Sequence, residues 1–269
     1  MSKILQTTIV AALAALTINH AFGQTPGPRR HAVINCVKVK DGKNAEFRAY
    51  LNDVTAKLYK SRVDTGEVAT YIVAAAVSPV GRAARCDYHL VATYNGIPAE
   101  VNAPGKLDAD LKRAGLNMTA EQLAARRDSL STLVSRETWR TREMVGGGAQ
   151  KGGYGRVNYF KIHQGMTADF VAAEESGWKP YAEERNKQNA GHTWSFHTLV
   201  MPGGENLPYN AMTVDGFPSW ESLMNSGSGR AIWNKVHPNL DSTAHFDRVN
   251  SISDRPFTDV VRIVDVIRK

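Results

Sequence analysis

The sequence contains none of the short motifs that mark the common catalytic classes. It has no GxSxG, no Walker phosphate-binding loop and no GxGxxG placed between a strand and a helix. The glycine-rich stretch at 152–155 precedes a predicted strand rather than a helix, so it cannot hold a phosphate at a helix N-terminus. The histidines form neither HxH nor HExxH, and we expect no metal site. These absences argue against common hydrolases, kinases and nucleotide-cofactor enzymes.

Long apolar runs are also scarce, and the one that stands out lies at the N-terminus. Lys3 precedes the apolar run Ile9–Ile18, and the small residues Ala21 and Gly23 follow it. The run is too short to span a membrane, and this order of features is typical of a signal peptide. We therefore expect residues 1–23 to be a signal peptide cleaved near Gly23. The mature protein would then be secreted or periplasmic, without a membrane span.

Cysteine is rare, with only Cys36 and Cys86 in the chain. An exported protein meets an oxidising compartment, which allows a disulfide. Both residues lie in or beside strands that we expect to be neighbours, but the register of those strands is not fixed by the sequence. A disulfide and a pair of buried thiols therefore both remain open.

Positive charge is in excess but is not concentrated. The chain has 33 Lys and Arg against 26 Asp and Glu, a net charge of +7. The basic residues are spread along the chain, and no nucleic-acid-binding motif is present. We expect a small-molecule ligand as partner, and no nucleic acid.

A short sequence segment occurs twice in similar form. Val39–Phe47 and Ile162–Phe170 superpose an aliphatic residue, a Gly, an Ala, an acid and a Phe when one is shifted by 123 positions, the difference between Gly165 and Gly42. Each copy ends an apolar stretch and opens a helical pattern. A junction repeated over about half the chain indicates an internally duplicated domain.

The pattern of elements supports two similar halves. We predict repeat 1 over residues 31–146, a Gly-rich linker over 147–154 and repeat 2 over 155–269. In each half the order is β-α-β-β-α-β, that of a ferredoxin-like fold. The predicted strands are 33–39, 68–77, 88–94 and 137–145, then 156–162, 192–201, 209–214 and 259–267. The predicted helices are 44–66, one opening at Thr119 and continuing to Leu133, 168–189 with a break near Trp178, and 218–225 with a second piece around 232–236.

Two halves of this kind, each with one bare sheet face, can bury those faces against each other. The expected fold is α+β, with two ferredoxin-like repeats pairing their sheets into one barrel, a pseudo-dimer in a single chain. At this point the sequence resembles the dimeric α/β-barrel superfamily, which includes antibiotic-biosynthesis-type monooxygenases, haem-degrading monooxygenases and stress-responsive barrel proteins. The resemblance implies oxidation of electron-rich aromatic substrates without a bound cofactor. It also allows a homo-oligomer, and haem as the one cofactor to consider.

Candidate site residues gather in the second half. Asn158 aligns with Asn35, and a mid-strand Asn amide can orient a ligand by hydrogen bonding. On the strand 192–201, His192, Trp194 and Phe196 share one face, and Thr193, Ser195 and His197 share the other. With Tyr159, Phe160 and Trp178, these residues suggest an aromatic cavity between sheet and helices, although aromatic rings also fill ordinary cores.

Several functions follow from this arrangement. The first is binding of an aromatic or apolar small molecule, or a cofactor-independent monooxygenase-like activity. Asn158 would orient the substrate, His192 or His197 would accept a proton, and Trp194 would form a wall. A non-catalytic envelope protein used for binding or assembly is the alternative. In haem-degrading relatives an Asn, a Trp and a helix His form the site; the resemblance matches Asn158 and His237 to two of these, but no Trp has the required spacing, which leaves haem binding as a third option.

Overall fold

Antiparallel strands form the centre of the molecule. The computed structural model describes residues 30–98, 105–189, 191–204, 206–226 and 229–269, so the predicted signal peptide, residues 1–23, lies outside the described residues. The strands are β1 (Arg30–Val39), β2 (Thr70–Ser78), β3 (Tyr88–Tyr94), β4 (Ser131–Val145), β5 (Tyr154–Ile162), β6 (Thr193–Met201), β7 (Ala211–Phe217) and β8 (Ser253–Arg268). They close into a barrel in the order β1-β3-β2-β8-β5-β7-β6-β4.

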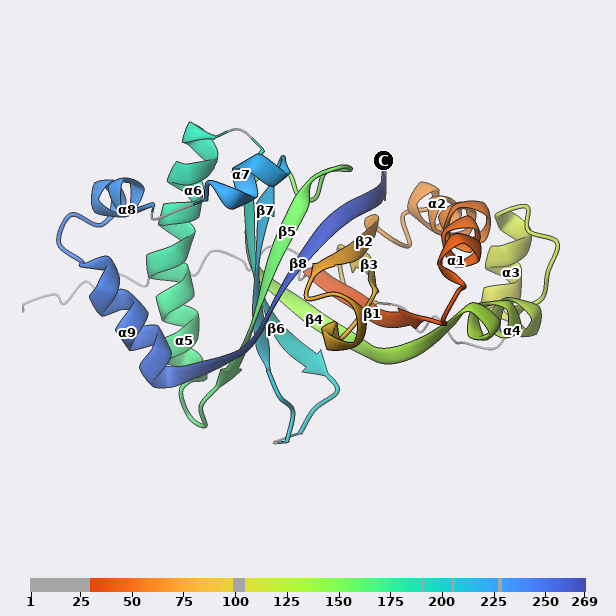
Figure 1. Cartoon of the computed structure of the whole chain (residues 1–269), viewed down its shortest axis with the longest axis horizontal. Helices are drawn as coiled ribbons and strands as arrows, with labels where there is room; N and C mark the ends of the chain where they lie inside the picture. Colours follow the sequence, from red (N-terminus) through yellow and green to blue (C-terminus); the bar gives the residue numbers. More distant parts are fainter. Residues whose placement is uncertain (1–29, 99–104, 190, 205, 227–228) are drawn as a thin grey trace, which may run out of the picture.

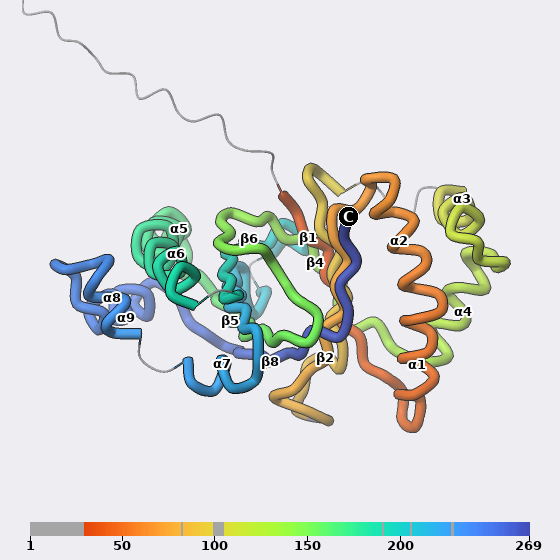
Figure 2. Tube along the Cα trace, turned by 90° about the horizontal axis from the view of Figure 1, so that it is seen from above, coloured from red at the N-terminus to blue at the C-terminus, as the bar shows by residue number. Residues whose placement is uncertain are grey.

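Helices cover the barrel on two opposite sides (Figures 1 and 2). One group contains α1 (Asn44–Tyr50), α2 (Ala56–Asp64), α3 (Lys106–Arg113) and α4 (Ala120–Leu130). The other contains α5 (Thr167–Ala173), α6 (Lys179–Gln188), α8 (Arg230–Val236) and α9 (Ser242–Ile252), with the short α7 (Trp220–Met224) beside β7. The chain therefore has a helix–sheet–helix arrangement with the barrel as its middle layer.

Where helices cover the barrel, the strands carry apolar residues on both faces. On β1, Val33 and Val37 pack outward against α1 and α2, whereas Ala32 and Ile34 face the barrel interior. On the other side, Phe160 and Phe196 face outward and pack with Phe170 of α5. The barrel thus separates one core inside it from two cores beneath the helices.

Corresponding elements of the two halves are separated by the same 123 positions as the two copies of the repeated sequence segment. The strand pairs β2 and β6, and β3 and β7, have bounds that differ by 123, as do α1 and α5. A π-helical turn follows each of these two helices, at Leu51–Thr55 and at Glu174–Trp178. The strand order is β4-β1-β3-β2 in the first half and β8-β5-β7-β6 in the second, and the halves join through β2–β8 and β4–β6 pairing.

Several predicted boundaries were wrong. Leu133 was assigned to a helix, but α4 ends at Leu130 and β4 begins at Ser131, because this strand continues well past its apolar part. Likewise β8 begins at Ser253, not at 259, through polar exposed residues that carry little strand signal. The helix α9 was not predicted. The expected break near Trp178 is the π-helical turn, which keeps the helix continuous with α6.

The two cysteines form a disulfide. Cys36 on β1 and Cys86, just before β3, have Cα atoms 5.2 Å apart and their sulfur atoms are bonded. Of the two alternatives that the sequence left open, the structure has the disulfide. It fastens the segment leading into β3 to the neighbouring strand.

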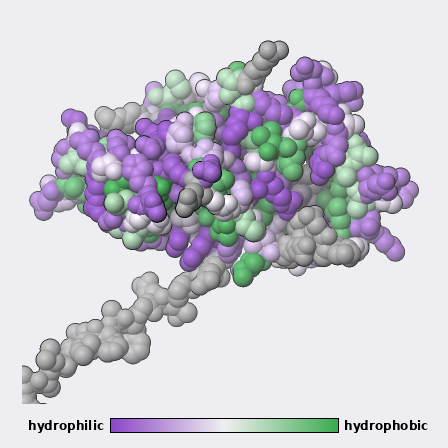
Figure 3. Space-filling view, turned by 90° about the horizontal axis from the view of Figure 1, so that it is seen from below, coloured by the Kyte–Doolittle hydropathy of each residue, from purple (hydrophilic) through white to green (hydrophobic). Residues whose placement is uncertain are grey.

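Hydrophilic side chains dominate the face of the molecule that Figure 3 shows, and the hydrophobic side chains on it form small separate groups. None of the helices within the described ranges is long and apolar enough to cross a membrane.

Candidate functional site

A cavity of about 390 Å³ occupies the barrel interior, and every one of the eight strands contributes to its lining. Its size lies in the range of small-molecule sites. The walls are made mainly of small and aliphatic side chains that point inward. These are Ala32, Ile34, Ile72, Ala74, Val91, Val157, Met212, Val214, Val261 and Ile263. The barrel is hollow at this level because its inward residues are too small to fill it.

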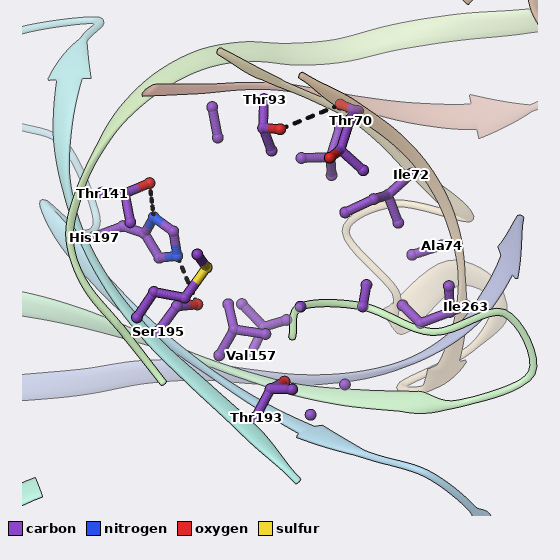
Figure 4. Close-up of a pocket in the computed structure, with 18 of the residues that line it drawn as sticks. Thr70, Ile72, Ala74, Thr93, Thr141, Val157, Thr193, Ser195, His197 and Ile263 are labelled. Carbon is purple, nitrogen blue, oxygen red and sulfur yellow. Dashed lines mark hydrogen bonds between the residues drawn. The ribbon is translucent and has the colours of Figure 1, made fainter. Parts of the chain in front are cut away.

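Three histidines contribute to the cavity wall, His31, His89 and His197, and Figure 4 shows His197 on β6. Its Nδ1 lies 3.1 Å from Thr141 Oγ1 on β4, and its Nε2 lies 2.8 Å from Ser195 Oγ. Burial away from water lowers the pKa of His197 to about 4, so the ring is neutral at pH 7. Since a neutral imidazole has one donor and one acceptor, one hydroxyl donates to the ring and the other accepts from it.

Further hydroxyls line the same cavity. Thr70 and Thr93 face each other across the β2–β3 pair, and Thr93 Oγ1 donates to the Thr70 carbonyl oxygen over 3.4 Å (Figure 4). Thr193 lies on β6, two residues before Ser195, and also points inward. The apolar walls are therefore interrupted by hydroxyls that can bond a ligand.

A polar network closes the barrel beyond Tyr159. Tyr159 OH accepts a hydrogen bond from Arg85 Nη2 over 2.8 Å, and Arg85 Nη1 lies 3.1 Å from Glu137 Oε1. Glu137 also accepts from Trp139 Nε1 over 3.1 Å and from Tyr209 OH over 2.5 Å. Because these groups bond one another, they form a floor and leave the cavity above them largely apolar.

The segment at 147–154 lines the cavity mouth. Its end is fixed to β8 by two backbone hydrogen bonds, from Gly152 N to Ile263 O over 2.9 Å and from Ile263 N to Gly153 O over 2.8 Å. A Cβ on Gly153 would lie 2.8 Å from the Phe217 carbonyl oxygen. Only glycine lets the backbone pass so close to β7. The sequence predicted a linker here but gave no sign that it borders a site.

Three of the nine predicted site residues border the cavity. Tyr159 and His197 point into the barrel, whereas the Trp194 side chain packs in the core beneath the helices. The described cavity lies inside the barrel, whereas the sequence suggested one between sheet and helices. The remaining six residues do not line it. They are Asn158, Phe160, Trp178, His192, Phe196 and His237.

Asn158 faces the helical layer and bonds its strand neighbours. Its Nδ2 donates to Thr213 Oγ1 over 3.3 Å and to Asp215 Oδ2 over 3.4 Å, and its Oδ1 accepts from Thr258 Oγ1 over 3.1 Å. His192 also lies outside the barrel, where its Nε2 is 2.7 Å from Ser222 Oγ. Burial lowers the pKa of His192 to about 4.

Trp178 and His237 belong to an aromatic cluster on the far side of the α5–α6 helix. The Trp178 ring centroid lies 5.4 Å from that of Trp233, and His237 Nε2 is 2.9 Å from the Gly177 carbonyl oxygen. This cluster holds α8 and α9 against the helix. It lies outside the barrel, and Trp178 also packs against the core between the barrel and α5.

The side chains between the sheet and the helices of the second half leave no room for a haem. A haem between sheet and helices would need the volume that Phe160, Phe170 and Phe196 occupy, and these side chains are 0–8% exposed. His237 Nε2 is already bonded to backbone, and both ring nitrogens of His197 are bonded to hydroxyls. Within the described residues there is also no group of three or more His, Cys, Asp and Glu placed to hold a metal ion.

Comparison with solved structures identifies the architecture. No protein-family model matches the sequence, and no curated protein matches it. A proposed monooxygenase from Fusobacterium nucleatum superposes with a TM-score of 0.55 at 9% identity, over 90% of this chain and 95% of that one. A proposed monooxygenase from Lactobacillus acidophilus superposes with a TM-score of 0.54 at 9% identity, over 89% and 96%. The chain therefore shares with these solved structures its overall fold, a closed antiparallel barrel with helices on two sides. An anthrone oxidase-like protein superposes with a TM-score of 0.50 at 10% identity, over 89% and 92%. At such identities the likeness concerns the fold alone.

Proposed function

We propose that this protein binds a small, largely apolar molecule inside the barrel. The observation that carries the proposal is the cavity of about 390 Å³, with mainly aliphatic walls and two buried neutral imidazoles, those of His89 and His197. An enclosed apolar space with a few convergent polar groups is the usual form of a ligand site. A flat aromatic molecule with a hydroxyl or carbonyl group suits these walls.

His197 would orient the ligand by hydrogen bonding. With a pKa of about 4 it is a weak proton acceptor at neutral pH, since an efficient general base has a pKa near the working pH. Its neighbours Ser195 and Thr141 keep the ring in one orientation. These properties favour binding over proton-transfer catalysis.

Oxidation of an electron-rich aromatic substrate is the second candidate. It is supported by the names of the structures with this fold, two proposed monooxygenases and an anthrone oxidase-like protein. The cavity could hold such a substrate with its hydroxyl at His197. Oxygen uptake with quinol-like aromatics would test this candidate, and a rate equal to the rate without protein would exclude those substrates.

We further propose that the chain is an internally duplicated pseudo-dimer, exported after loss of residues 1–23. The constant 123-residue separation of strands, helices and π-helical turns supports the duplication. The disulfide between Cys36 and Cys86 is in keeping with an oxidising compartment. N-terminal sequencing of protein recovered from the periplasm or medium tests the export; a mature chain that still begins at Met1 would contradict it.

Binding can be tested with a neutral fluorescent probe such as N-phenyl-1-naphthylamine. Ile72→Trp places a large ring in the cavity, whereas Val134→Trp adds the same ring at an exposed site on β4. We expect the wild type and Val134→Trp to enhance probe fluorescence, and Ile72→Trp to lose most of the enhancement. Equal enhancement by both variants would show that the probe binds elsewhere and would remove the support for a barrel site.

A further inference from the structure

The charges around the cavity are all of one sign. The described residues that line it include two arginines, Arg30 and Arg268, and no Lys, Asp or Glu. Both arginines are exposed at the surface. The cavity therefore combines an uncharged interior with a positive entrance.

The strand register places both arginines at the same end of the barrel. Arg268 on β8 pairs with Thr70 on β2, Thr70 pairs with Thr93 on β3, and His31, next to Arg30 on β1, pairs with Tyr94. Three strand steps of about 4.8 Å thus separate the two backbones, roughly 14 Å along the rim. Because arginine side chains are long, both guanidinium groups can approach one group at the mouth.

Nearby groups leave this positive charge uncompensated along the two strands. Asp265, three residues before Arg268, is paired with Lys151 over 2.9 Å, and Glu143, on the strand beside β1, is paired with Lys179 over 2.7 Å. Arg268 Nη1 itself contacts an uncharged group, the Gly147 carbonyl oxygen, at 3.4 Å. An anion at the mouth would therefore meet two arginines, and no Asp or Glu among the described residues that line the cavity.

We propose that the ligand is an amphiphilic carboxylate, with its apolar body inside the barrel and its acid group at the rim between Arg30 and Arg268. This inference rests on the proposed binding function and names the chemical class of the ligand. A carboxylate matches the planar, two-pronged donor geometry of a guanidinium group. The interior could not hold the charge, because burial without a paired cation is unfavourable. The acid group must therefore stay at the entrance.

Two ligands that differ mainly in charge test binding in the barrel and the preference for a carboxylate separately. Naphthalene-2-carboxylate and naphthalene-2-carboxamide have the same ring and nearly the same shape, and differ in charge. Each is titrated against the full mature protein by displacement of N-phenyl-1-naphthylamine. We expect the carboxylate to bind roughly fivefold to twentyfold more tightly, since each exposed arginine contributes a factor of about two to five. Raising the salt from about 50 mM to about 500 mM should weaken the carboxylate and leave the amide unchanged.

Variants assign this preference to the rim. Arg30→Gln with Arg268→Gln should make carboxylate and amide bind equally, and Arg30→Lys with Arg268→Lys should restore part of the preference. Arg255→Gln, an exposed arginine near the start of β8, is the matched control and should behave as wild type. Equal binding of both ligands to the wild type would overturn the carboxylate inference and leave the binding function standing. If neither ligand nor the probe bound, the binding function itself would be lost.

Discussion

His197 Nε2 lies 2.8 Å from Ser195 Oγ. Ser195 lies two residues before His197 on β6, so both side chains are on the inner face of the strand. The opposite ring nitrogen lies 3.1 Å from Thr141 Oγ1 on the neighbouring strand. The imidazole is thus held between two hydroxyls in the wall of an apolar cavity. A ligand that bonds the ring must share it with Ser195 or Thr141, or displace one of them.

Replacing His197 should weaken binding of ligands that carry a hydroxyl group. For His197→Leu we expect 2-naphthol to bind roughly fivefold to tenfold more weakly, because one hydrogen bond contributes about 1 kcal/mol. Naphthalene itself should bind with unchanged affinity. Displacement titration measures both, and an equal loss for both ligands would indicate a collapsed cavity instead of a lost hydrogen bond.

Stability should depend on pH through the same residue. Burial lowers the pKa of His197 to about 4 from an ordinary value of 6.5, so the unfolded chain binds the proton more readily. Its contribution is therefore complete above pH 6.5 and is lost as the pH falls towards 4, by about 2 to 3 kcal/mol at pH 4.5. Urea unfolding at several pH values should show this slope reduced in His197→Gln. A full wild-type slope in His197→Gln would instead assign the pH dependence to another buried histidine such as His89, whose pKa burial also lowers to about 4.

The linker at the cavity mouth offers a second matched pair. Gly153→Ala would place a Cβ 2.8 Å from the Phe217 carbonyl oxygen, whereas Gly147→Ala meets nothing within 4 Å. We expect Gly153→Ala to lower the free energy of unfolding by about 1 to 3 kcal/mol, and Gly147→Ala to leave it nearly unchanged. Chemical denaturation compares the two. Similar stability in both variants would mean that the linker moves away from β7 at little cost.

The disulfide should contribute substantially to stability. Cys36 and Cys86 are separated by 50 positions, and closing a loop of that length removes about 4 kcal/mol of unfolded-chain entropy. Cys36→Ser with Cys86→Ser should therefore unfold at lower urea concentration than the oxidised wild type. A reducing agent should bring the wild type to the same midpoint and should not affect the double variant.

Strand faces were the part of the site that the sequence could predict. Side chains alternate strictly along a strand, so Ser195 and His197 were correctly placed on one face and Trp194 and Phe196 on the other. The same alternation could not tell which face was hollow. That depends on whether the inward side chains of all strands together fill the closed barrel, and small residues such as Ala32 and Ala74 do not.

Other features were missed for local reasons. The buried side of α9 consists of His245, Val249 and Ile252, which have helical spacing, but a histidine at the first of these positions hides the pattern. The sequence did not predict Thr70 and Thr93 as site residues, because threonine is common in strands. Their place in the cavity wall follows from the register of β2 and β3. Arg30 and Arg268 lie at opposite ends of the described chain, and the pairing of β8 with β2, of β2 with β3 and of β3 with β1 brings them to one rim.

The pairing of β4 with β6 and of β2 with β8 has a consequence for folding. Every strand in the described barrel has two hydrogen-bonded neighbours, and the bonds that complete the ring connect one half of the chain to the other. Either half alone would end in two long unpaired strands, the kind of surface on which proteins aggregate or exchange segments. The full chain is therefore the smallest unit that can satisfy its own backbone. Cutting the chain at the linker would therefore give two sheets with exposed edge strands that are prone to aggregate, and not two stable domains.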